Sequence, residues 1–391
     1  MPNKGLYLNM RKIAIVHEWF TSIAGAERVV EQMLKVFPEA DVFCVCLDEE
    51  VVRKTPFLAS RKITTTFIQR LPWARRKYRA YLPLMPLAIE QLDVSAYDVV
   101  ISSSHAVAKG VLTGPDQLHV SYVHSPIRYA WDLQHQYLRE SGLVHGAKAW
   151  LARWLLHKIR LWDYRTGAGV DAFVANSRFI ARRIRKVYRR EATVIYPPVS
   201  VDDFTCQAQK EDFYLAASRL VPYKMMDVIV QAFARMPDRR LVLIGDGPDM
   251  EKIRALAGPN VQVMGYQPFA VLKEHMMRAK AFIFAAEEDF GITPVEAMAS
   301  GTPVIAYGKG GALETVVETE DAKRATGLFF DAQTPEAIAD AVELFERSAV
   351  PFSAEVCRAH AEGFSDARFR QEFGAFVRAC WDKFDQERNV A

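Results

Sequence analysis

Cysteines and long hydrophobic runs are scarce in this chain of 391 residues. Its five cysteines form no Cys-x-x-Cys pair, which argues against a zinc site or a disulfide framework and predicts free, buried thiols. No apolar run approaches the roughly 20 residues that a helix needs to cross a bilayer. The N-terminal stretch MPNKGLYLNMRK lacks the apolar core of a signal peptide, so we expect a cytoplasmic protein.

Acidic residues are scarce only in the first half of the chain. Residues 1–200 carry 29 Lys and Arg against 17 Asp and Glu, a net charge of +12, whereas the remainder has a net charge of −9. A basic half predicts an anionic partner, such as a phosphate, a nucleic acid or an acidic membrane surface. Because no nucleic-acid-binding motif is present, we expect no nucleic acid among the partners. A non-catalytic protein that binds nucleic acid or membrane is the alternative from another functional class.

Short hydrophobic segments alternate with amphipathic ones along the whole chain, which is typical of βαβ units and a parallel sheet. The length suits two such α/β domains. Strands are predicted at residues 12–18, 41–47, 98–103, 119–124, 172–176 and 193–196 in the first half, and at 213–217, 241–244, 261–264, 281–285, 303–307 and 326–330 in the second.

A hinge between the domains is predicted around residues 196–201. Pro197 and Pro198 suppress both helix and strand there, and a polar stretch follows them. We therefore expect an N-terminal domain at residues 1–199 and a C-terminal domain at residues 200–365. A closing amphipathic helix at residues 366–391 is expected to pack back towards the N-terminal domain.

The segment AAEEDFGITPVEAMASGTPV, at residues 285–304, contains the clearest candidate site. A buried strand is predicted to end near its start, and a glycine-containing turn leads into a helix. The backbone N–H groups of Phe290, Gly291 and Ile292, with the helix N-terminus behind them, can face an anion.

Two carboxylates flank this turn, with seven residues between them. Glu288 lies on the loop, and Glu296 lies in the first turn of a helix that is predicted to begin at Thr293. Carboxylates so placed can accept hydrogen bonds from sugar hydroxyls on either side of a bound diphosphate. The alternative interpretation is local: Thr293 and Glu296 form a capping box, and Glu288 and Asp289 are solvated loop acids.

Two cations follow another predicted strand. Arg219 and Lys224 are five positions apart on a strand-to-helix loop, where an arginine fork and a lysine point charge can converge on a diphosphate. They would offset the negative charge that develops on a leaving diphosphate, a task otherwise performed by a divalent metal. The alternative is a pair of ordinary surface charges.

Further loops follow other predicted strands. Gly245 and Gly247 form a Gly-x-Gly turn that lacks the third glycine of a dinucleotide fingerprint, so a tight turn is the alternative. Gly25 lies in a turn of small residues that opens a helix, where a phosphate or sugar can approach closely. His124 ends a predicted strand and is a candidate site residue or a core histidine, and His105 likewise follows a strand end.

The segment from Glu288 to Glu296, with its EAMASGTPV continuation, resembles the signature of the retaining glycosyltransferases of family GT4. The resemblance extends over almost the whole chain and is strongest over residues 213–331. It implies the GT-B architecture, in which two Rossmann-like domains with parallel sheets face an interdomain cleft. It also implies a nucleotide-sugar donor held mainly by the C-terminal domain.

The resemblance assigns roles to individual residues. Glu288 is implied to contact the donor sugar and Glu296 the ribose hydroxyls, while Arg219 and Lys224 bind the diphosphate. His124 is implied to face the donor sugar, which completes a catalytic set of Arg219, Lys224, Glu288 and His124. The other donor-binding residues that the resemblance implies are Gly25, Gly245, Gly247, Met264, Phe290, Gly291, Ile292 and Thr293. At Ala24-Gly25 the chain departs from the double glycine usual in the family.

The string YVHSPIRYAWD at residues 122–132 resembles a subgroup of bacterial O-antigen mannosyltransferases. This implies transfer of a hexose, mannose from GDP-mannose, to a polyprenyl-diphosphate-linked oligosaccharide in lipopolysaccharide synthesis, without a metal or other cofactor. His105 is a candidate to line the acceptor site. A UDP- or ADP-sugar donor is the alternative within the family, and a sugar epimerase or a phosphorylase is the alternative among enzymes of similar fold.

Two tracts combine basic and aromatic residues. One runs from Arg70 to Arg79 and the other from Trp150 to Tyr164. Clustered tryptophans and cations on a helix are typical of binding to anionic lipid headgroups, so a peripheral membrane contact is one interpretation. The other is a helix that faces the core and has a solvated basic back.

Overall fold

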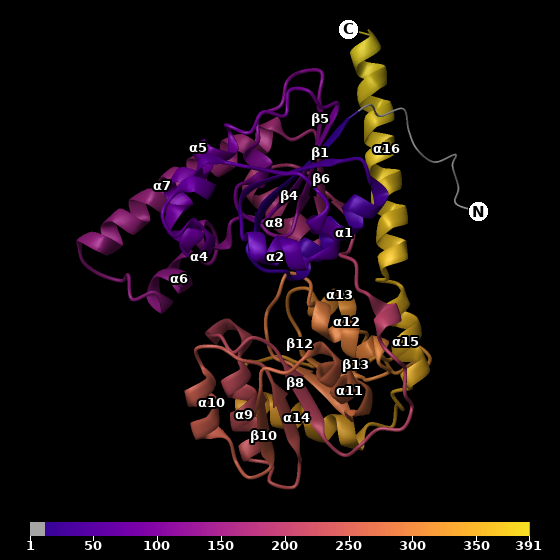
Figure 1. Ribbon diagram of the computed structural model, residues 1–391. Helices are drawn as coiled ribbons and strands as arrows, with labels where there is room; N and C mark the ends of the chain where they lie inside the picture. Colours follow the sequence, from indigo (N-terminus) through magenta and orange to yellow (C-terminus); the bar gives the residue numbers. More distant parts are fainter. Residues whose placement is uncertain (1–11, 391) are drawn as a thin grey trace. The chain divides into compact units, whose positions relative to one another are not determined.

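The computed structural model describes residues 12–390, and the prediction that no signal peptide is present falls almost entirely outside them. The residues before Pro197, together with those from Phe369 onward, form unit 1, and Pro197–Arg368 forms unit 2. Each unit has its own parallel sheet and its own core (Figure 1). Within residues 12–390, every helix is too short or too polar to cross a bilayer.

Unit 1 contains seven parallel strands in the order β3-β2-β1-β4-β5-β6-β7. They are β1 (Ile13–Phe20), β2 (Asp41–Leu47), β3 (Ile63–Thr65), β4 (Val99–Ser104), β5 (Leu118–Val123), β6 (Ala172–Ala175) and β7 (Thr193–Val194). All six predicted strands are present, with ends within two residues of the prediction. The sequence analysis missed β3, because three residues at the edge of a sheet are too few to set up a recognisable pattern.

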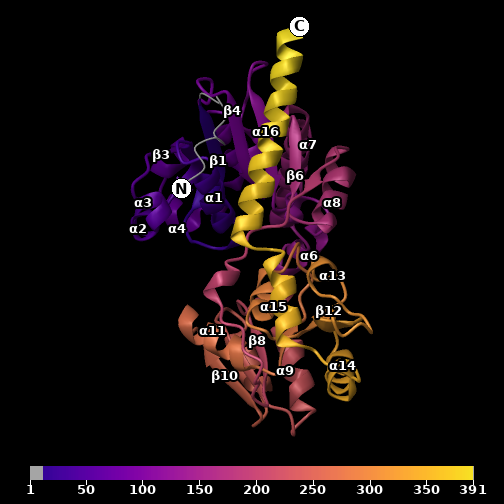
Figure 2. The ribbon, with the colours of Figure 1, turned by 90° about the vertical axis from the view of Figure 1, so that its right-hand side faces the viewer.

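The helices of unit 1 cover both faces of this sheet (Figures 1 and 2). They are α1 (Gly25–Val36), α2 (Glu49–Lys54), α3 (Pro56–Ala59), α4 (Ala74–Lys77), α5 (Met85–Ile89), α6 (Gln134–Glu140), α7 (Ala147–Thr166), α8 (Arg178–Tyr188) and most of α16 (Asp366–Val390). Along β1, Ile15 packs towards α1 and α16, whereas Ala14 and Val16 pack towards α4 and α5. Because both faces are buried, these strands appear in the sequence as continuous hydrophobic runs.

Helix α16 joins the core of unit 1 although it lies at the other end of the chain. Phe369, Phe373 and Val377 recur at helical spacing and are fully buried in that core. The close approach of α16 to α1 depends on Gly374, where a Cβ would lie 3.1 Å from the Val36 side chain.

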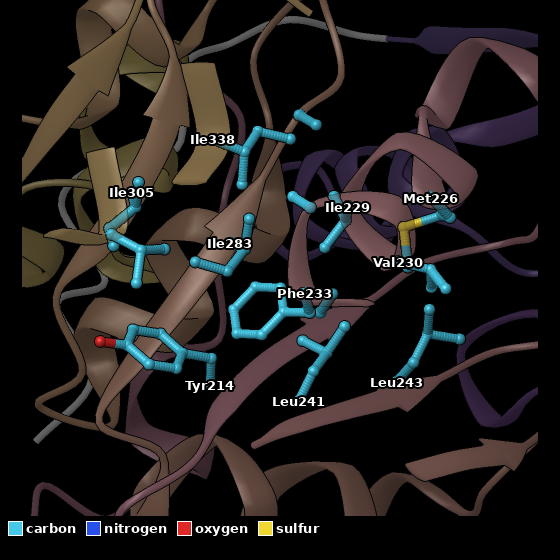
Figure 3. Packing of buried hydrophobic residues seen from close by; sticks show 14 of the residues in the cluster. Tyr214, Met226, Ile229, Val230, Phe233, Leu241, Leu243, Ile283, Ile305 and Ile338 are labelled. Carbon is cyan, nitrogen blue, oxygen red and sulfur yellow. The ribbon is translucent and has the colours of Figure 1, made fainter. Parts of the chain in front are cut away.

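Unit 2 contains six parallel strands in the order β10-β9-β8-β11-β12-β13. They are β8 (Tyr214–Ala217), β9 (Leu241–Ile244), β10 (Val261–Gly265), β11 (Ala281–Phe284), β12 (Val304–Tyr307) and β13 (Gly327–Phe330), all within one residue of the prediction. The helices are α9 (Met226–Ala234), α10 (Met250–Leu256), α11 (Phe269–Arg278), α12 (Ile292–Ala299), α13 (Ala312–Thr315), α14 (Pro335–Arg347) and α15 (Ala354–Glu362). Figure 3 shows part of the core, where Phe233 of α9 lies against Ile283 and Leu241 of the sheet.

The strand orders place a topological switch point in each sheet. In unit 2 the chain builds outward from β8 in one direction and then from β11 in the other, and β8 and β11 are neighbours. In unit 1 the corresponding neighbours are β1 and β4. In open α/β sheets of this kind, ligands bind beyond the carboxyl ends of the strands at the switch point. The prediction of two doubly wound, Rossmann-like domains is confirmed.

Candidate active site

The loops at the switch point of unit 2 bring together two of the predicted catalytic residues. Lys224 ends a short 3₁₀ turn, η7 (Pro222–Lys224), that follows β8, and Glu288 lies on the loop that follows β11. Their side chains form an ion pair and are only 16% and 19% exposed, respectively. The predicted description of Glu288 as a solvated loop acid is therefore wrong, and so is that of Asp289, which is buried.

Local backbone conformation directs Lys224 towards this edge. Pro222 begins the 3₁₀ turn, and Met225 adopts a left-handed φ of 54° that redirects the chain into α9. Arg219 lies earlier on the same loop, is exposed, and has no ion-pair partner among residues 12–390. One cation of the loop is thus neutralised by a carboxylate, while the other is open to an anionic ligand.

Helix α12 begins earlier than the sequence predicted. Its N-cap is Gly291, which has a φ of +84°, and its first residue is Ile292. Thr293 therefore lies inside the helix, and the N-cap residue, a glycine, has no side chain to make a capping hydrogen bond. A capping box with Glu296 would require Thr293 as the N-cap. The N-cap is instead Gly291, two residues upstream and in the left-handed region, so the capping-box interpretation of Glu296 is wrong. Glu296 follows one turn later and is half-buried.

The turn before α12 is held by a loop that the sequence analysis missed. The N–H of Gly311 donates to the carbonyl of Glu288 at 2.8 Å. A Cβ at Gly310 would lie 2.4 Å from the Glu288 carbonyl oxygen, and one at Gly311 would lie 2.3 Å from the Cα of Phe290. The sequence signal for this loop was the pair Gly310-Gly311 after strand β12, because only glycine permits this backbone to approach that of Glu288 and Phe290 so closely.

The two glycines of the Gly-x-Gly turn have a similar structural reason. A Cβ at Gly245 would lie 1.8 Å from the carbonyl oxygen of Ser218, and one at Gly247 would lie 2.3 Å from that of Leu220. The N–H of Leu220 also donates to the Asp246 carbonyl at 2.9 Å. These glycines let the turn after β9 pack against the loop that carries Arg219, and their contact with a nucleotide stays a prediction.

Met264 and the start of α12 complete the predicted donor residues of unit 2. Met264 is half-buried near the carboxyl end of β10, and its carbonyl accepts a hydrogen bond from the Gln267 side chain at 2.8 Å. Ile292 and Thr293 are half-buried in the first turn of α12, whereas Phe290 is buried against Phe364.

The remaining predicted site residues, Gly25 and His124, belong to unit 1. Gly25 is the first residue of α1, whose N-cap is Ala24. Ala24 has no side chain that could cap the helix. Instead, the Glu27 carboxylate accepts a hydrogen bond of 2.8 Å from the backbone N–H of Ala24. His124 follows β5 and is half-buried, and its Nε2 lies 2.8 Å from the Ser103 hydroxyl.

A buried carboxylate organises the neighbouring loop, and the sequence analysis missed it as well. Glu18 of β1 is fully buried and accepts the backbone N–H groups of residues 105–108, at 2.7 to 3.1 Å. Although burial alone raises the pKa of a carboxyl group, His105 and these N–H groups hold the pKa of Glu18 below its ordinary value. Glu18 therefore stays ionised and holds the loop that carries His105.

The two basic-aromatic tracts also lie in unit 1. On α7, Trp150, Trp154, Lys158 and Leu161 recur at helical spacing along an exposed stripe, with Trp150 67% exposed. Trp73, beside α4, is 73% exposed. Helix α7 has both of the predicted sides: Ala149, Ile159, Asp163 and Thr166 are buried, whereas the stripe from Trp150 to Leu161 is exposed.

A buried ion pair anchors that second half of α7. Asp163 is paired with Lys109, and both side chains are inaccessible to solvent. Asp163 also accepts hydrogen bonds from the indole of Trp131 at 2.7 Å and the hydroxyl of Tyr188 at 3.0 Å. The satisfied carboxylate fixes the end of α7 against the segments that carry Lys109, Trp131 and Tyr188.

Sequence comparisons identify a family for each half of the chain. Residues 23–203 match the family model "Glycosyltransferase Family 4", and residues 204–361 match "Glycosyl transferases group 1". The chain is 31% identical over 209 residues to a GDP-mannose-dependent alpha-(1-6)-phosphatidylinositol monomannoside mannosyltransferase of Mycobacterium tuberculosis. This alignment covers 46% of this chain and 53% of that protein. The chain is also 28% identical over 221 residues to a D-inositol 3-phosphate glycosyltransferase of Mycobacteroides abscessus, in an alignment that covers 50% of this chain and 48% of that protein. The matches thus span about half the length of these curated relatives.

Solved structures share the fold over nearly the whole chain. A sucrose-phosphate synthase from Thermosynechococcus elongatus superimposes with a TM-score of 0.72 at 17% identity, covering 95% of this chain and all of that one. HepE of Anabaena in complex with UDP superimposes with a TM-score of 0.68, also at 17% identity, covering 94% of this chain and all of that one. At such identities the likeness establishes the fold alone.

Proposed function

The chain belongs to glycosyltransferase family 4, and we propose that it transfers mannose from GDP-mannose to a polyprenyl-diphosphate-linked oligosaccharide, with retention of anomeric configuration. The Lys224–Glu288 ion pair at the switch point of unit 2, beside the open Arg219, carries this proposal. It is the arrangement that a diphosphate and its attached sugar require: cations for the phosphates and a carboxylate for sugar hydroxyls. The mycobacterial relative, a GDP-mannose-dependent mannosyltransferase, supports the choice of donor.

In the proposed reaction, the bond between the sugar anomeric carbon and the diphosphate oxygen breaks while the acceptor oxygen bonds to the same face of the sugar. The proton of the acceptor hydroxyl passes to the leaving diphosphate. Arg219 and Lys224 stabilise the negative charge that develops on that group, and Glu288 orients the sugar. We propose that no metal ion is needed, because the two cations supply this charge. Closure of the two domains would exclude water and so limit hydrolysis of the donor.

Calorimetric titration tests the donor assignment. The purified protein, without added metal, is titrated with GDP, UDP, ADP and GDP-mannose. We expect GDP and GDP-mannose to bind and UDP and ADP not to bind, because the proposed donor carries guanine. Glu296→Ala is expected to abolish this binding, since Glu296 is proposed to accept the ribose hydroxyls. Glu343→Ala, which removes an exposed carboxylate of α14 that pairs with Arg347, serves as the matched control and should bind normally.

The other outcomes of this titration separate the alternatives. Binding of UDP or ADP in preference to GDP would retain the glycosyltransferase and overturn the mannose donor. Binding of none of the four nucleotides would contradict the donor site in unit 2.

We further propose that the protein works at the cytoplasmic face of a membrane, held there peripherally by the exposed residues of α7 and the tract from Arg70 to Arg79. A lipid-linked acceptor presents its sugar at such a surface. Exposed tryptophans next to lysines and arginines are typical of surfaces that bind at the boundary between the headgroups and the acyl chains of an anionic leaflet.

A further inference from the structure

The ion pair between Lys224 and Glu288 involves the same ammonium group that is proposed to bind the donor diphosphate. Both side chains are mostly buried, and they belong to loops that follow the neighbouring strands β8 and β11. A diphosphate that binds Lys224 must therefore compete with Glu288 for its N–H donors. Arg219 differs in this respect, because it is exposed and has no ion-pair partner among residues 12–390.

The backbone that carries this pair is held on both sides. The N–H of Gly311 donates to the Glu288 carbonyl at 2.8 Å, which ties the loop after β11 to the loop after β12. The N–H of Lys224 donates to the Val221 carbonyl at 3.0 Å and closes the 3₁₀ turn. We therefore expect any exchange of partners to involve the two side chains rather than the loops.

A nucleotide sugar and the nucleotide left after transfer differ in what they offer to Glu288. GDP-mannose, the proposed donor, offers phosphates to Lys224 and sugar hydroxyls to Glu288, so each member of the pair exchanges one partner for another. GDP offers phosphates alone. When GDP takes the ammonium group, a mostly buried carboxylate is left without its cation, which is destabilising.

We propose that Glu288 is a specificity-determining residue, which discriminates GDP-mannose from GDP by competing with the diphosphate for Lys224. The competition is relieved by the sugar of the donor and returns once that sugar has been transferred. It therefore lowers the affinity for GDP and favours its release. This inference rests on the proposed function, because it takes the diphosphate and the sugar as ligands of these two loops.

The substitution Glu288→Gln removes the charge of the carboxylate and keeps the size of the side chain. In calorimetric titrations without added metal, we expect this variant to bind GDP more tightly than the unsubstituted protein does. The ratio of the dissociation constant for GDP to that for GDP-mannose should fall at least tenfold. The reason is that Lys224 becomes available to the diphosphate of either ligand, whereas only GDP-mannose loses a carboxylate acceptor for its sugar.

A double-mutant cycle separates competition for Lys224 from simple repulsion between Glu288 and the diphosphate. If the two anions compete for the ammonium group, the gain in GDP affinity requires that group. Glu288→Gln should then raise GDP affinity less than twofold when it is introduced into Lys224→Met. An equal gain in both backgrounds would indicate repulsion alone and would overturn the inference.

Glu346→Gln is the matched control in the same unit. The Glu346 side chain is 18% exposed, against 19% for Glu288, and it pairs with Lys280 at 2.8 Å. Lys280 immediately precedes β11, so this pair lies at the amino end of that strand, whereas Glu288 follows its carboxyl end. The control should bind GDP and GDP-mannose like the unsubstituted protein.

The remaining outcomes separate this inference from the proposed function. An unchanged ratio of the two dissociation constants in Glu288→Gln would overturn the inference and leave the donor assignment intact. Preference of the unsubstituted protein for UDP over GDP would overturn the guanine nucleotide alone, and the same cycle with UDP and UDP-glucose would decide the inference. Binding of none of these nucleotides would contradict the donor site and the inference together.

Discussion

Lys224 illustrates how much a single residue depends on its partner. Its ammonium group is mostly buried against Glu288, so its charge is balanced before any ligand binds. A donor diphosphate brings more negative charge than one carboxylate and can draw the ammonium group towards itself. In the proposed reaction, the Glu288 carboxylate that Lys224 leaves would then accept hydrogen bonds from sugar hydroxyls.

Removing this ammonium group should slow the chemical step. We expect Lys224→Ala to lower turnover about 10²–10³-fold, comparable to the loss of one oxyanion-stabilising donor. The measurement is steady-state turnover with the donor at saturation. Arg235→Ala, which removes the exposed cation that pairs with Glu336 in the same unit, should retain normal turnover. Near-normal turnover in Lys224→Ala would contradict the catalytic assignment.

At the scale of an element, α7 combines two opposite environments. Its second half is anchored by the buried Asp163–Lys109 pair, while its first half exposes Trp150 and Trp154. A helix held firmly at one end can present large aromatic side chains to a membrane without losing its own packing.

Removing the exposed indoles of α7 should weaken membrane binding. We expect Trp150→Ser with Trp154→Ser to lower the partition onto phosphatidylglycerol vesicles at least tenfold, because both rings are proposed to insert between headgroups. Co-sedimentation measures this partition, and phosphatidylcholine vesicles show how much of it depends on lipid charge. Leu344→Ser, at an exposed hydrophobic residue of α14 in unit 2, is the control and should bind like the unsubstituted protein. Equal binding by the double variant would contradict the proposed surface.

At the scale of the whole molecule, buried histidines make stability depend on pH. His119 on β5 is fully buried, donates through Nδ1 to the Gly169 carbonyl at 3.2 Å, and accepts the Ser102 hydroxyl at Nε2 at 2.9 Å. Burial lowers its pKa from 6.5 to about 4. Between these values the unfolded chain binds more protons than the folded one, so folding stability is lost as pH falls below 6.5.

The loss of folding stability at low pH can be measured for unit 1 alone. All seven tryptophans lie in that unit, so tryptophan fluorescence reports its unfolding. Urea unfolding followed by tryptophan fluorescence should show a free energy of unfolding lower at pH 5 than at pH 7, with about 2 kcal/mol of the difference due to His119. In His119→Gln that part of the pH dependence should disappear, since glutamine does not titrate. The comparison uses the difference between the two pH values, so a general destabilisation by the substitution does not affect it. An identical difference in both proteins would refute the role of His119.

Much of the fold could be predicted from the sequence, because βαβ alternation is a local pattern. Twelve of the thirteen strands follow from short hydrophobic runs, and the loops that carry Arg219, Lys224 and Glu288 follow from the ends of those runs. The start of α12 could not be predicted, because Thr293 with Pro294 is a strong local start signal. The positive φ of Gly291 overrides it, since the loop around Gly310 packs against the preceding turn.

By itself, the sequence determined the order of strands and helices, the doubling of the α/β pattern and the positions of the loops after each strand. Only the tertiary structure decided which side chains meet. Lys224 meets Glu288 because β8 and β11 are neighbours in the sheet, and His17 meets Ser103 because β1 and β4 pair in one particular register. The physical reason is that hydrophobic periodicity is set by neighbouring residues, whereas strand order and register result from packing between segments far apart in the chain.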